Sequence, residues 1–162
     1  MASSSTPSQC SIRARIIFSI IGIVAGLSVF IVFAAHYRNW NTSLWGLISA
    51  CVASLTLYVH IQYVRCKWQT FPYQLRYWML SGCLSQLVGV CGFTVYLTLA
   101  ITEHQGLTAY GAGYYLTSVW CFMTLKWGFV LFYFSRSYKQ LYYDIYTILP
   151  KDDADVMPYY TK

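Results

Sequence analysis

The chain has 162 residues, of which 57% are hydrophobic and only 10% are charged, and its formal net charge is +6. A soluble domain carries about 25% charged residues, so this composition excludes a soluble domain and predicts an integral membrane protein without a nucleic-acid partner. The six cysteines form no CxxC pair and lie mostly in apolar stretches, which indicates neither a disulfide framework nor a zinc site.

Four apolar stretches are long enough to cross a bilayer as helices, since about 20 residues at about 1.5 Å each span roughly 30 Å. They lie at 16–35, 44–64, 77–101 and 114–134. The predicted fold class is therefore an all-α integral membrane protein, with a four-helix transmembrane domain over 16–138. The flanking residues, 1–15 and 139–162, are expected to be tails, and the first of them is Ser-rich and expected to be disordered.

The first two predicted helices differ in the residues on their packing faces. The first contains Gly22 and Gly26 in a GxxxG spacing, which lets a second helix approach closely. The second carries a polar stripe on one face, made of Ser49, Thr56, His60 and Tyr63. A histidine in such a stripe more often bonds a neighbouring helix than binds a ligand, and both roles stay open at this point.

The third predicted helix repeats small residues every four positions, at Ser81, Ser85 and Gly89, which favours close packing. The loop that follows it, 102–113, has no Lys or Arg. Basic residues near the membrane collect on the other side, with Arg38 as the exception: Arg13, Arg15, Arg65, Lys67, Arg76, Arg136 and Lys139. Basic segments face the cytosol, so both termini are predicted to be cytosolic.

The fourth predicted helix carries a lysine, Lys126, near its middle. A lysine in hydrocarbon costs about 2.5–3.5 kcal/mol on insertion scales and marks a functional site by default. It belongs to a stripe with alternating steps of four and three: Tyr115, Val119, Phe122, Lys126, Phe129, Tyr133 and Arg136. Such a stripe is either a packing face of a helix bundle or a surface for a flat, apolar, anionic molecule.

Most enzyme signatures are missing, because the chain has no HExxH, no GxSxG, no Gly-rich nucleotide loop and no carboxylate inside the predicted helices. We therefore expect that it is not an enzyme. Candidate ligand residues lie instead at three depths of the predicted membrane domain. His104 is on the side opposite the cytosol, His60, Tyr63 and Lys126 are inside the membrane, and Arg136 and Tyr138 are at the cytosolic side. His and Tyr ligate haem iron, and Lys and Arg pair with carboxylates.

Three segments carry a resemblance to a known family: 101–108 (Ile-Thr-Glu-His-Gln-Gly-Leu-Thr), 114–120 (Tyr-Tyr-Leu-Thr-Ser-Val-Trp) and 126–127 (Lys-Trp). Together with four helices at family spacing, they make the chain resemble the heme-responsive-gene family of haem transporters, solute carrier family 48. The resemblance implies an importer that moves haem from the cell exterior or an endolysosomal lumen to the cytosol, with haem as substrate and no other cofactor.

The resemblance also implies which residues contact haem. The family's His or Tyr in the second helix falls on His60 and its luminal-loop His on His104, so these two would ligate the iron. Tyr63, one turn past His60, is a further candidate ligand. The family motif Phe-Ala-Arg-Lys-Tyr falls on 134–138, where Phe134, Arg136 and Tyr138 match it and Ser135 and Ser137 depart from it.

The alternative to transport is a non-transporting tetraspan scaffold or trafficking adaptor, in which Lys126 snorkels or meets a partner protein. Small-residue faces on the first and third helices predict a homo-oligomer in the lipid bilayer. The second tail contains two Tyr-x-x-bulky-apolar patterns that are typical of sorting signals, Tyr142 to Ile145 and Tyr146 to Leu149. An interfacial helix is the other interpretation of this tail. We expect residence in endosomal or lysosomal membrane and in the plasma membrane.

Overall fold

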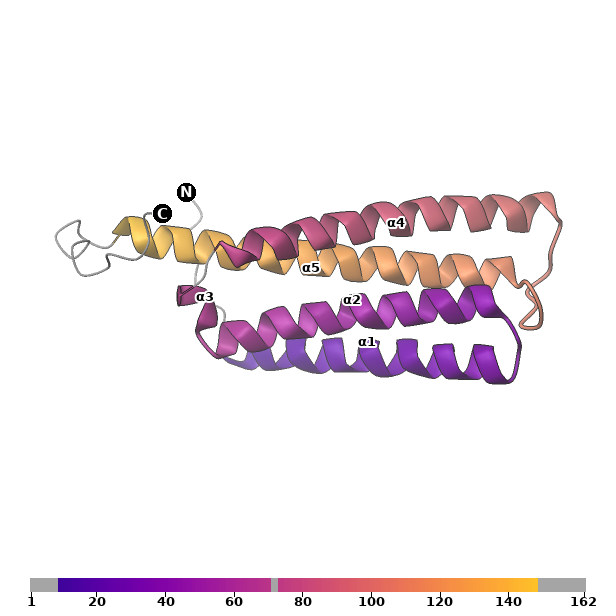
Figure 1. Ribbon diagram of the computed structural model, residues 1–162, viewed down its shortest axis with the longest axis horizontal. Coiled ribbons are helices and arrows are strands. Elements are labelled where there is room, and N and C mark those ends of the chain that lie inside the picture. Colours follow the sequence, from indigo (N-terminus) through magenta and orange to yellow (C-terminus); the bar gives the residue numbers. More distant parts are fainter. Residues whose placement is uncertain (1–8, 71–72, 149–162) are drawn as a thin grey trace.

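A computed structural model describes residues 9–70 and 73–148, with side chains over 9–68 and 73–142. Within these ranges all regular structure is helical (Figure 1): α1 Gln9–Ala35, α2 Trp40–Val64, α3 Lys67–Thr70, α4 Gln74–Thr102 and α5 Tyr114–Ile148. Four of these helices are long and apolar enough to cross a membrane, and α3 is a single turn. The predicted all-α class with four membrane-spanning helices is thereby confirmed.

Two helices extend beyond the apolar stretches that predict them. α1 begins at Gln9, so residues 9–15 are helical and not part of a disordered tail, and α5 continues past residue 134 to Ile148. Hydropathy marks where the chain leaves hydrocarbon, whereas a helix continues until a residue such as Pro interrupts its hydrogen bonds. No Gly or Pro occurs in 9–15 or 135–148, and Pro150 follows shortly after α5.

Side-chain hydrogen bonds lie near both ends of α2. The helix begins at Trp40 because the Asn39 side-chain oxygen accepts a hydrogen bond of 3.1 Å from the Thr42 N–H. At the other end, the buried Trp68 of α3 folds back, and its indole Nε1–H donates to the Val59 carbonyl at 3.2 Å. The start of the connection between α2 and α4 is therefore attached to the helix bundle.

The four long helices form two hairpins, α1 with α2 and α4 with α5, and close glycine contacts hold each hairpin together. A Cβ added at Gly26 of α1 would lie 2.8 Å from the Gly46 carbonyl oxygen of α2. In the second hairpin, a Cβ added at Gly82 of α4 would lie 2.7 Å from the Phe132 backbone nitrogen of α5. Glycine permits such an approach of two backbones, so each hairpin is packed backbone against backbone.

The two hairpins meet through α2 and α5, which form the centre of the molecule (Figure 1). Within the most apolar 18 residues of each helix, the buried share is 44% in α2 and 39% in α5, compared with 11% in α1 and in α4. Near their first turns the Thr42 and Thr117 hydroxyl oxygens are 2.9 Å apart, and near the other end the Tyr63 and Tyr138 rings stack at 4.1 Å. In each pair the two residues are 75 positions apart in the chain, so α2 and α5 run parallel and keep the same register along their contact.

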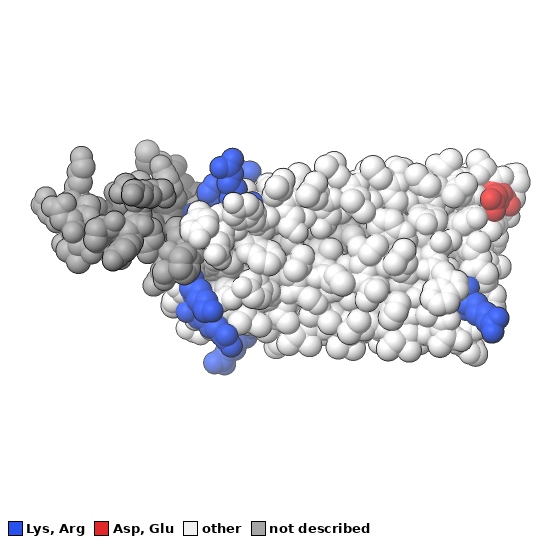
Figure 2. All heavy atoms as spheres, viewed as in Figure 1, with Lys and Arg blue, Asp and Glu red and all other residues white. Residues whose placement is uncertain are grey.

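On the face that Figure 2 shows, charged side chains lie at the two ends of the molecule. Lys and Arg gather at the end where α1 begins and α2 ends, whereas the opposite end shows both basic and acidic atoms. The sequence places Arg38 and Glu103 in the turns at that opposite end. This asymmetry is the basis of the predicted orientation in the membrane.

Candidate functional site

The polar stripe of α2 faces α5, and its histidine is buried there. His60 exposes 1% of its surface, and its Nδ1 lies 2.9 Å from the Tyr138 hydroxyl of α5. Thr42 and Tyr63 share a helical face with His60, and both of them contact α5, at Thr117 and at Tyr138. His60 and Tyr138, which were predicted from separate parts of the chain, are therefore hydrogen-bonding partners.

Aromatic rings surround the His60 imidazole. The Phe134 ring meets it edge-on, with the centroids 4.8 Å apart and the planes at 66°, and the Tyr138 ring lies 5.9 Å away at 84°. Tyr63, one turn further along α2, stacks on Tyr138 with the ring planes 11° apart. We call these four residues, His60, Tyr63, Phe134 and Tyr138, the histidine box. It brings together four of the seven residues that the sequence predicts to contact haem.

The hydrogen bond in the histidine box engages Nδ1 of the imidazole, so Nε2 is the nitrogen that a ligand would have to use. A metal-ligating histidine usually donates its other ring N–H to a neighbouring group, which fixes the tautomer. Two tautomers fit the bond between His60 Nδ1 and the Tyr138 hydroxyl. The one in which Nδ1–H donates to the phenol oxygen leaves the lone pair of Nε2 for iron, and this is the tautomer that haem binding would require. Because the imidazole is almost wholly buried, the surrounding helices must part before a large ligand reaches Nε2.

Sequence reasoning missed one neighbour of the histidine box, Arg15 of α1. Its guanidinium carbon lies 4.4 Å from the centroid of the Phe134 ring, in the range of a cation–π interaction. From the sequence alone, Arg15 contributes only to the predicted orientation of the chain in the membrane. No sequence pattern links it to residues at the end of the fourth predicted helix, because they are far away in the chain. It supplies a cation beside the box in a chain that has Ser137 where the family motif has lysine.

Lys126 lies at the boundary between the two hairpins. Its Nζ is 4.7 Å from the centroid of the Phe18 ring of α1 and 4.9 Å from that of Trp127. Both distances are within the range of cation–π interactions, so two aromatic faces stabilise the ammonium group within the membrane. Phe18 is the second neighbour of a predicted site residue that sequence reasoning missed.

The stripe of α5 to which Lys126 belongs faces outward. Its apolar members Val119, Phe122, Phe129 and Tyr133 are each 51–56% exposed, so of the two interpretations of the stripe, a packing face within the bundle is wrong. The buried face has the same steps of four and three at other positions: Thr117, Cys121, Thr124, Gly128, Leu131, Ser135 and Tyr138. Periodicity identifies a face but not its direction, because apolar side chains are equally stable toward lipid.

The two remaining predicted residues are exposed and lie apart from the histidine box. His104 follows α4 at the end of the molecule opposite the box, where its φ is 47° and its N–H donates to the Ile101 carbonyl at 3.2 Å. Arg136 lies on the exposed side of α5. The two predicted histidine ligands thus stand at opposite ends of the bundle, as separate sites.

A second aromatic group, which the sequence does not predict, lies at the same end as His104. His36 meets Tyr37 edge-on at 4.8 Å. Tyr110, from the loop between α4 and α5, lies 5.0 Å from Tyr37 and 6.3 Å from His36. Aromatic residues of this kind are typical of the membrane–water interface, which is where the sequence predicts the turns at this end of the bundle.

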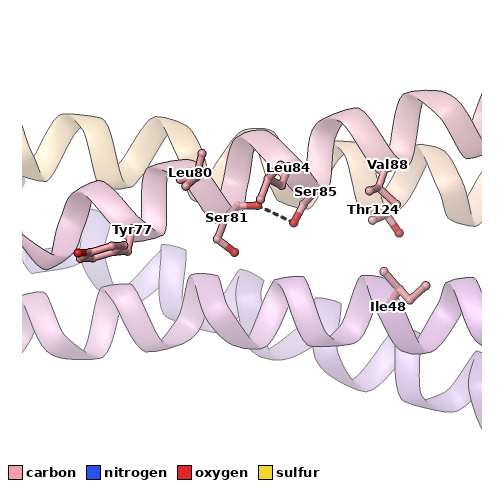
Figure 3. A pocket seen from close by; sticks show the side chains of 8 residues that line it. All are labelled: Ile48, Tyr77, Leu80, Ser81, Leu84, Ser85, Val88 and Thr124. Carbon is pink, nitrogen blue, oxygen red and sulfur yellow. Dashed lines mark hydrogen bonds between the residues drawn. The ribbon is translucent and has the colours of Figure 1, made fainter.

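A groove of about 390 Å³ lies between α2 and α4, beside α5 (Figure 3). Ile48 of α2, Thr124 of α5 and six side chains of α4 line it. The Ser85 hydroxyl donates to the Ser81 carbonyl, and that of Thr124 to a carbonyl of its own helix. The lining residues include no imidazole and no cation, so apart from the Tyr77 phenol the groove offers no ligand for iron and it offers no charged partner for a carboxylate.

Comparison with known proteins identifies relatives of the chain. A family model described as "Haem-transporter, endosomal/lysosomal, haem-responsive gene" matches residues 75–127, from the start of α4 into α5. Among proteins of Caenorhabditis elegans, heme transporter hrg-1 is 29% identical over 80% of this chain and 69% of its own length, and heme transporter hrg-6 is 28% identical over 82% and 84%. Heme transporter hrg-4 is 26% identical over 80% and 81%. No solved structure matches the chain.

Proposed function

We propose that this chain, a relative of the haem-responsive-gene haem transporters, moves haem across a membrane. The observation on which this proposal rests is the histidine box, in which a buried imidazole is held at Nδ1 by a tyrosine hydroxyl and flanked by aromatic rings. The imidazole is an axial ligand for iron. The Arg15 guanidinium beside the box suits a haem propionate, because guanidinium and carboxylate form strong charge-assisted pairs.

The side chains favour haem over a free metal ion. Over 9–68 and 73–142, no three His, Cys, Asp or Glu side chains gather closely enough to hold an ion. A porphyrin brings four nitrogen ligands of its own, so one imidazole from the protein is enough to bind its iron. Single protein ligands also suit a carrier, because a substrate held by one ligand is easily passed to the next.

The direction we propose is from the His104 end to the end with the histidine box, and thus from a lumen or the cell exterior to the cytosol. The cations at the box end support a cytosolic position for that end. The family description supports endosomal and lysosomal membranes, and we add the plasma membrane. The uncovered outer helices α1 and α4 leave room for a second copy, so a homo-oligomer is part of the proposal.

The two candidate sorting signals, Tyr142 to Ile145 and Tyr146 to Leu149, stay a prediction. The backbone is helical as far as Ile148, as an interfacial helix would be, but the side chains after Tyr142 lie outside the described residues. Binding of sorting adaptors through these signals would place the chain in endosomes and lysosomes. A chain shortened after Lys139 that keeps the same distribution would remove this role.

Growth of a haem-auxotrophic cell tests the proposed function. Cells that express the chain should grow on a limiting supply of external haem that does not support cells with an empty vector. Purified protein should also unfold at a higher temperature with haem present, because a ligand at 100 times its Kd stabilises the folded state by about 2.7 kcal/mol. A chain that reaches the membrane and gives neither result would favour the non-transporting scaffold or trafficking adaptor.

His104→Ala is expected to lower haem uptake at low haem concentration and to leave uptake at saturating haem close to that of the parent. His104 is exposed at the end where haem would arrive, so its loss weakens capture without altering the path. Uptake is measured against haem concentration at matched surface expression. Leu107→Ala, at an 86% exposed position of the same loop, is the control. An equal reduction at all concentrations would contradict a capture role.

Lys126→Met is expected to insert at least as well as the parent, because the cost of a charge in the membrane disappears and a thioether packs well on the rings of Phe18 and Trp127. Haem uptake should nevertheless fall roughly tenfold, which corresponds to the loss of one charge-assisted hydrogen bond of about 1.5 kcal/mol. Uptake and surface abundance are measured together, with Lys126→Arg as the variant that keeps the charge. Unchanged uptake by Lys126→Met would show that Lys126 has no part in transport.

A further inference from the structure

The contact between α2 and α5 is built differently from the contacts within the hairpins. Inside each hairpin, glycines bring the backbones together, as at Gly26 and Gly82. Between α2 and α5, the Thr42 and Thr117 hydroxyls meet at one end and the Tyr63 and Tyr138 rings at the other. In the same register, steps of seven residues place Ser49 at the level of Thr124 and Thr56 at the level of Leu131. Apolar core residues of both helices, among them Val52, Val59 and Leu131, lie along the same interface. We call the line of polar residues along this interface the polar seam.

Polar atoms along the seam lack partners. The Ser49 and Ser135 hydroxyl oxygens are buried, and so is the Asn39 side-chain nitrogen at the seam's first turn; none of the three has a hydrogen bond to another described residue. A buried polar group without a partner destabilises a protein by about 1–3 kcal/mol. These groups therefore weaken the closed seam, and they would gain partners if the seam opened to water or to a polar substrate.

Side chains of α1 and α5 also meet along this boundary. The Arg15 guanidinium of α1 lies over Phe134 of α5, and the Lys126 ammonium of α5 lies over Phe18 of α1. Side-chain contacts of this kind separate without disturbing the backbone packing inside either hairpin. When the hairpins part, Arg15 loses Phe134 and Lys126 loses Phe18, while Lys126 keeps Trp127 of its own helix. Both cations are then more accessible to carboxylates.

We propose, on the basis of the haem transport proposed above, that haem passes between the two hairpins along the polar seam. The seam runs from the Thr42–Thr117 contact, at the His104 end, to the histidine box. The opened seam offers hydroxyl groups and two cations to the propionates, and His60 at its far end offers a nitrogen to the iron. Each hairpin moves as a unit, because glycine packing holds it together and helix pairs of membrane transporters rock against each other in this way.

A disulfide across the seam tests this path. Thr42→Cys with Thr117→Cys places two thiols where hydroxyl oxygens are now 2.9 Å apart, which is within reach of a disulfide. We expect haem uptake by the oxidised variant to fall at least about tenfold, since locked hairpins cannot rock apart, and to recover when dithiothreitol reduces the bond. Uptake by each single-cysteine variant, whatever its level relative to the parent, should not change on oxidation.

A matched control joins helices inside one hairpin. In Val29→Cys with Gly46→Cys, the two Cβ atoms would lie about 3.3 Å apart, close to the separation in a disulfide, and the bond links α1 to α2 near the same end of the bundle. Oxidation of this variant should leave uptake unchanged. Ser49→Cys with Thr124→Cys, which the register places opposite each other, repeats the test within the membrane.

The outcomes separate the path from the function. No haem uptake by the parent chain in the same cells would overturn the proposed function and the path with it. Normal uptake by the parent, together with equal uptake by the oxidised and reduced Thr42/Thr117 pair, would overturn the path alone. Cleavage in the 65–73 connection followed by electrophoresis shows that the oxidised halves are covalently joined. Loss of uptake in the oxidised Val29/Gly46 control would also count against the path, because that bond leaves the seam free.

Discussion

The double variant His60→Ala with Tyr63→Phe is expected to transport no haem, whereas His60→Ala alone should lower the maximal rate and retain part of it. His60 is the imidazole that the structure buries between α2 and α5. Tyr63, one turn away, carries a phenol in the histidine box that can also ligate iron. The single variant keeps this phenol, and the double variant has neither ligand. Haem-dependent growth and protein abundance are measured together for both variants.

The hydrogen bond to Tyr138 calls for its own control in this experiment. His60→Ala leaves the buried Tyr138 hydroxyl without its partner, which is expected to cost about 1–3 kcal/mol and to lower abundance somewhat. Tyr138→Phe removes the same bond but keeps the imidazole and the ring stack with Tyr63. If Tyr138→Phe loses as much transport as the double variant, the bond accounts for the effect. If the double variant transports like the parent, neither His60 nor Tyr63 is a haem ligand.

Gly82→Ala is expected to prevent stable packing of α4 on α5. The new methyl group would lie 2.7 Å from the Phe132 nitrogen, 2.9 Å from the Gly128 carbonyl oxygen and 3.0 Å from the Phe132 Cα. All three are backbone atoms, which cannot rotate away as a side chain does, so the two helices must separate along their contact. We expect destabilisation at or above the upper end of the range of about 1–3 kcal/mol for overpacked sites.

The matched control for this substitution is Gly106→Ala, because a Cβ at Gly106 meets no atom within 4 Å. The melting temperature and the monodisperse fraction of purified protein are compared for the two variants and the parent. Gly106→Ala should match the parent, and Gly82→Ala should melt lower and aggregate. Equal melting temperatures for both variants would show that the α4–α5 contact is looser than described.

The four membrane-spanning helices are predictable because each apolar run meets a simple length requirement set by the bilayer. The partners of the helices are not predictable in the same way. Gly22 and Gly26 form one GxxxG spacing, yet Gly26 packs on the backbone of α2, whereas Gly22 lies under the Trp127 ring of α5. A small residue permits close approach, but it does not specify which helix or side chain approaches.

The candidate site was visible in the sequence as separate residues, not as a site. Family resemblance pointed to His60, Phe134 and Tyr138, and their contacts appear only when α2 and α5 pack in register. Arg15 and Phe18 escaped notice because they contact residues of α5 that are far away in the chain. The periodic stripe through Lys126 did not reveal which face of α5 is buried, because a bilayer accepts apolar side chains as readily as a protein core does.

During synthesis, α2 and its histidine are made before α5, the helix that covers this histidine in the folded protein. The 65–113 segment separates the end of α2 from the start of α5, and a ribosome that adds about 5–20 residues per second needs roughly 2–10 s to make it. In that interval Thr56 is bonded to the Val52 carbonyl of its own helix, but His60 has no Tyr138. The first hairpin alone therefore presents an unpartnered imidazole within the membrane, and a chain that stalls before α5 offers this group to the cell's quality-control machinery.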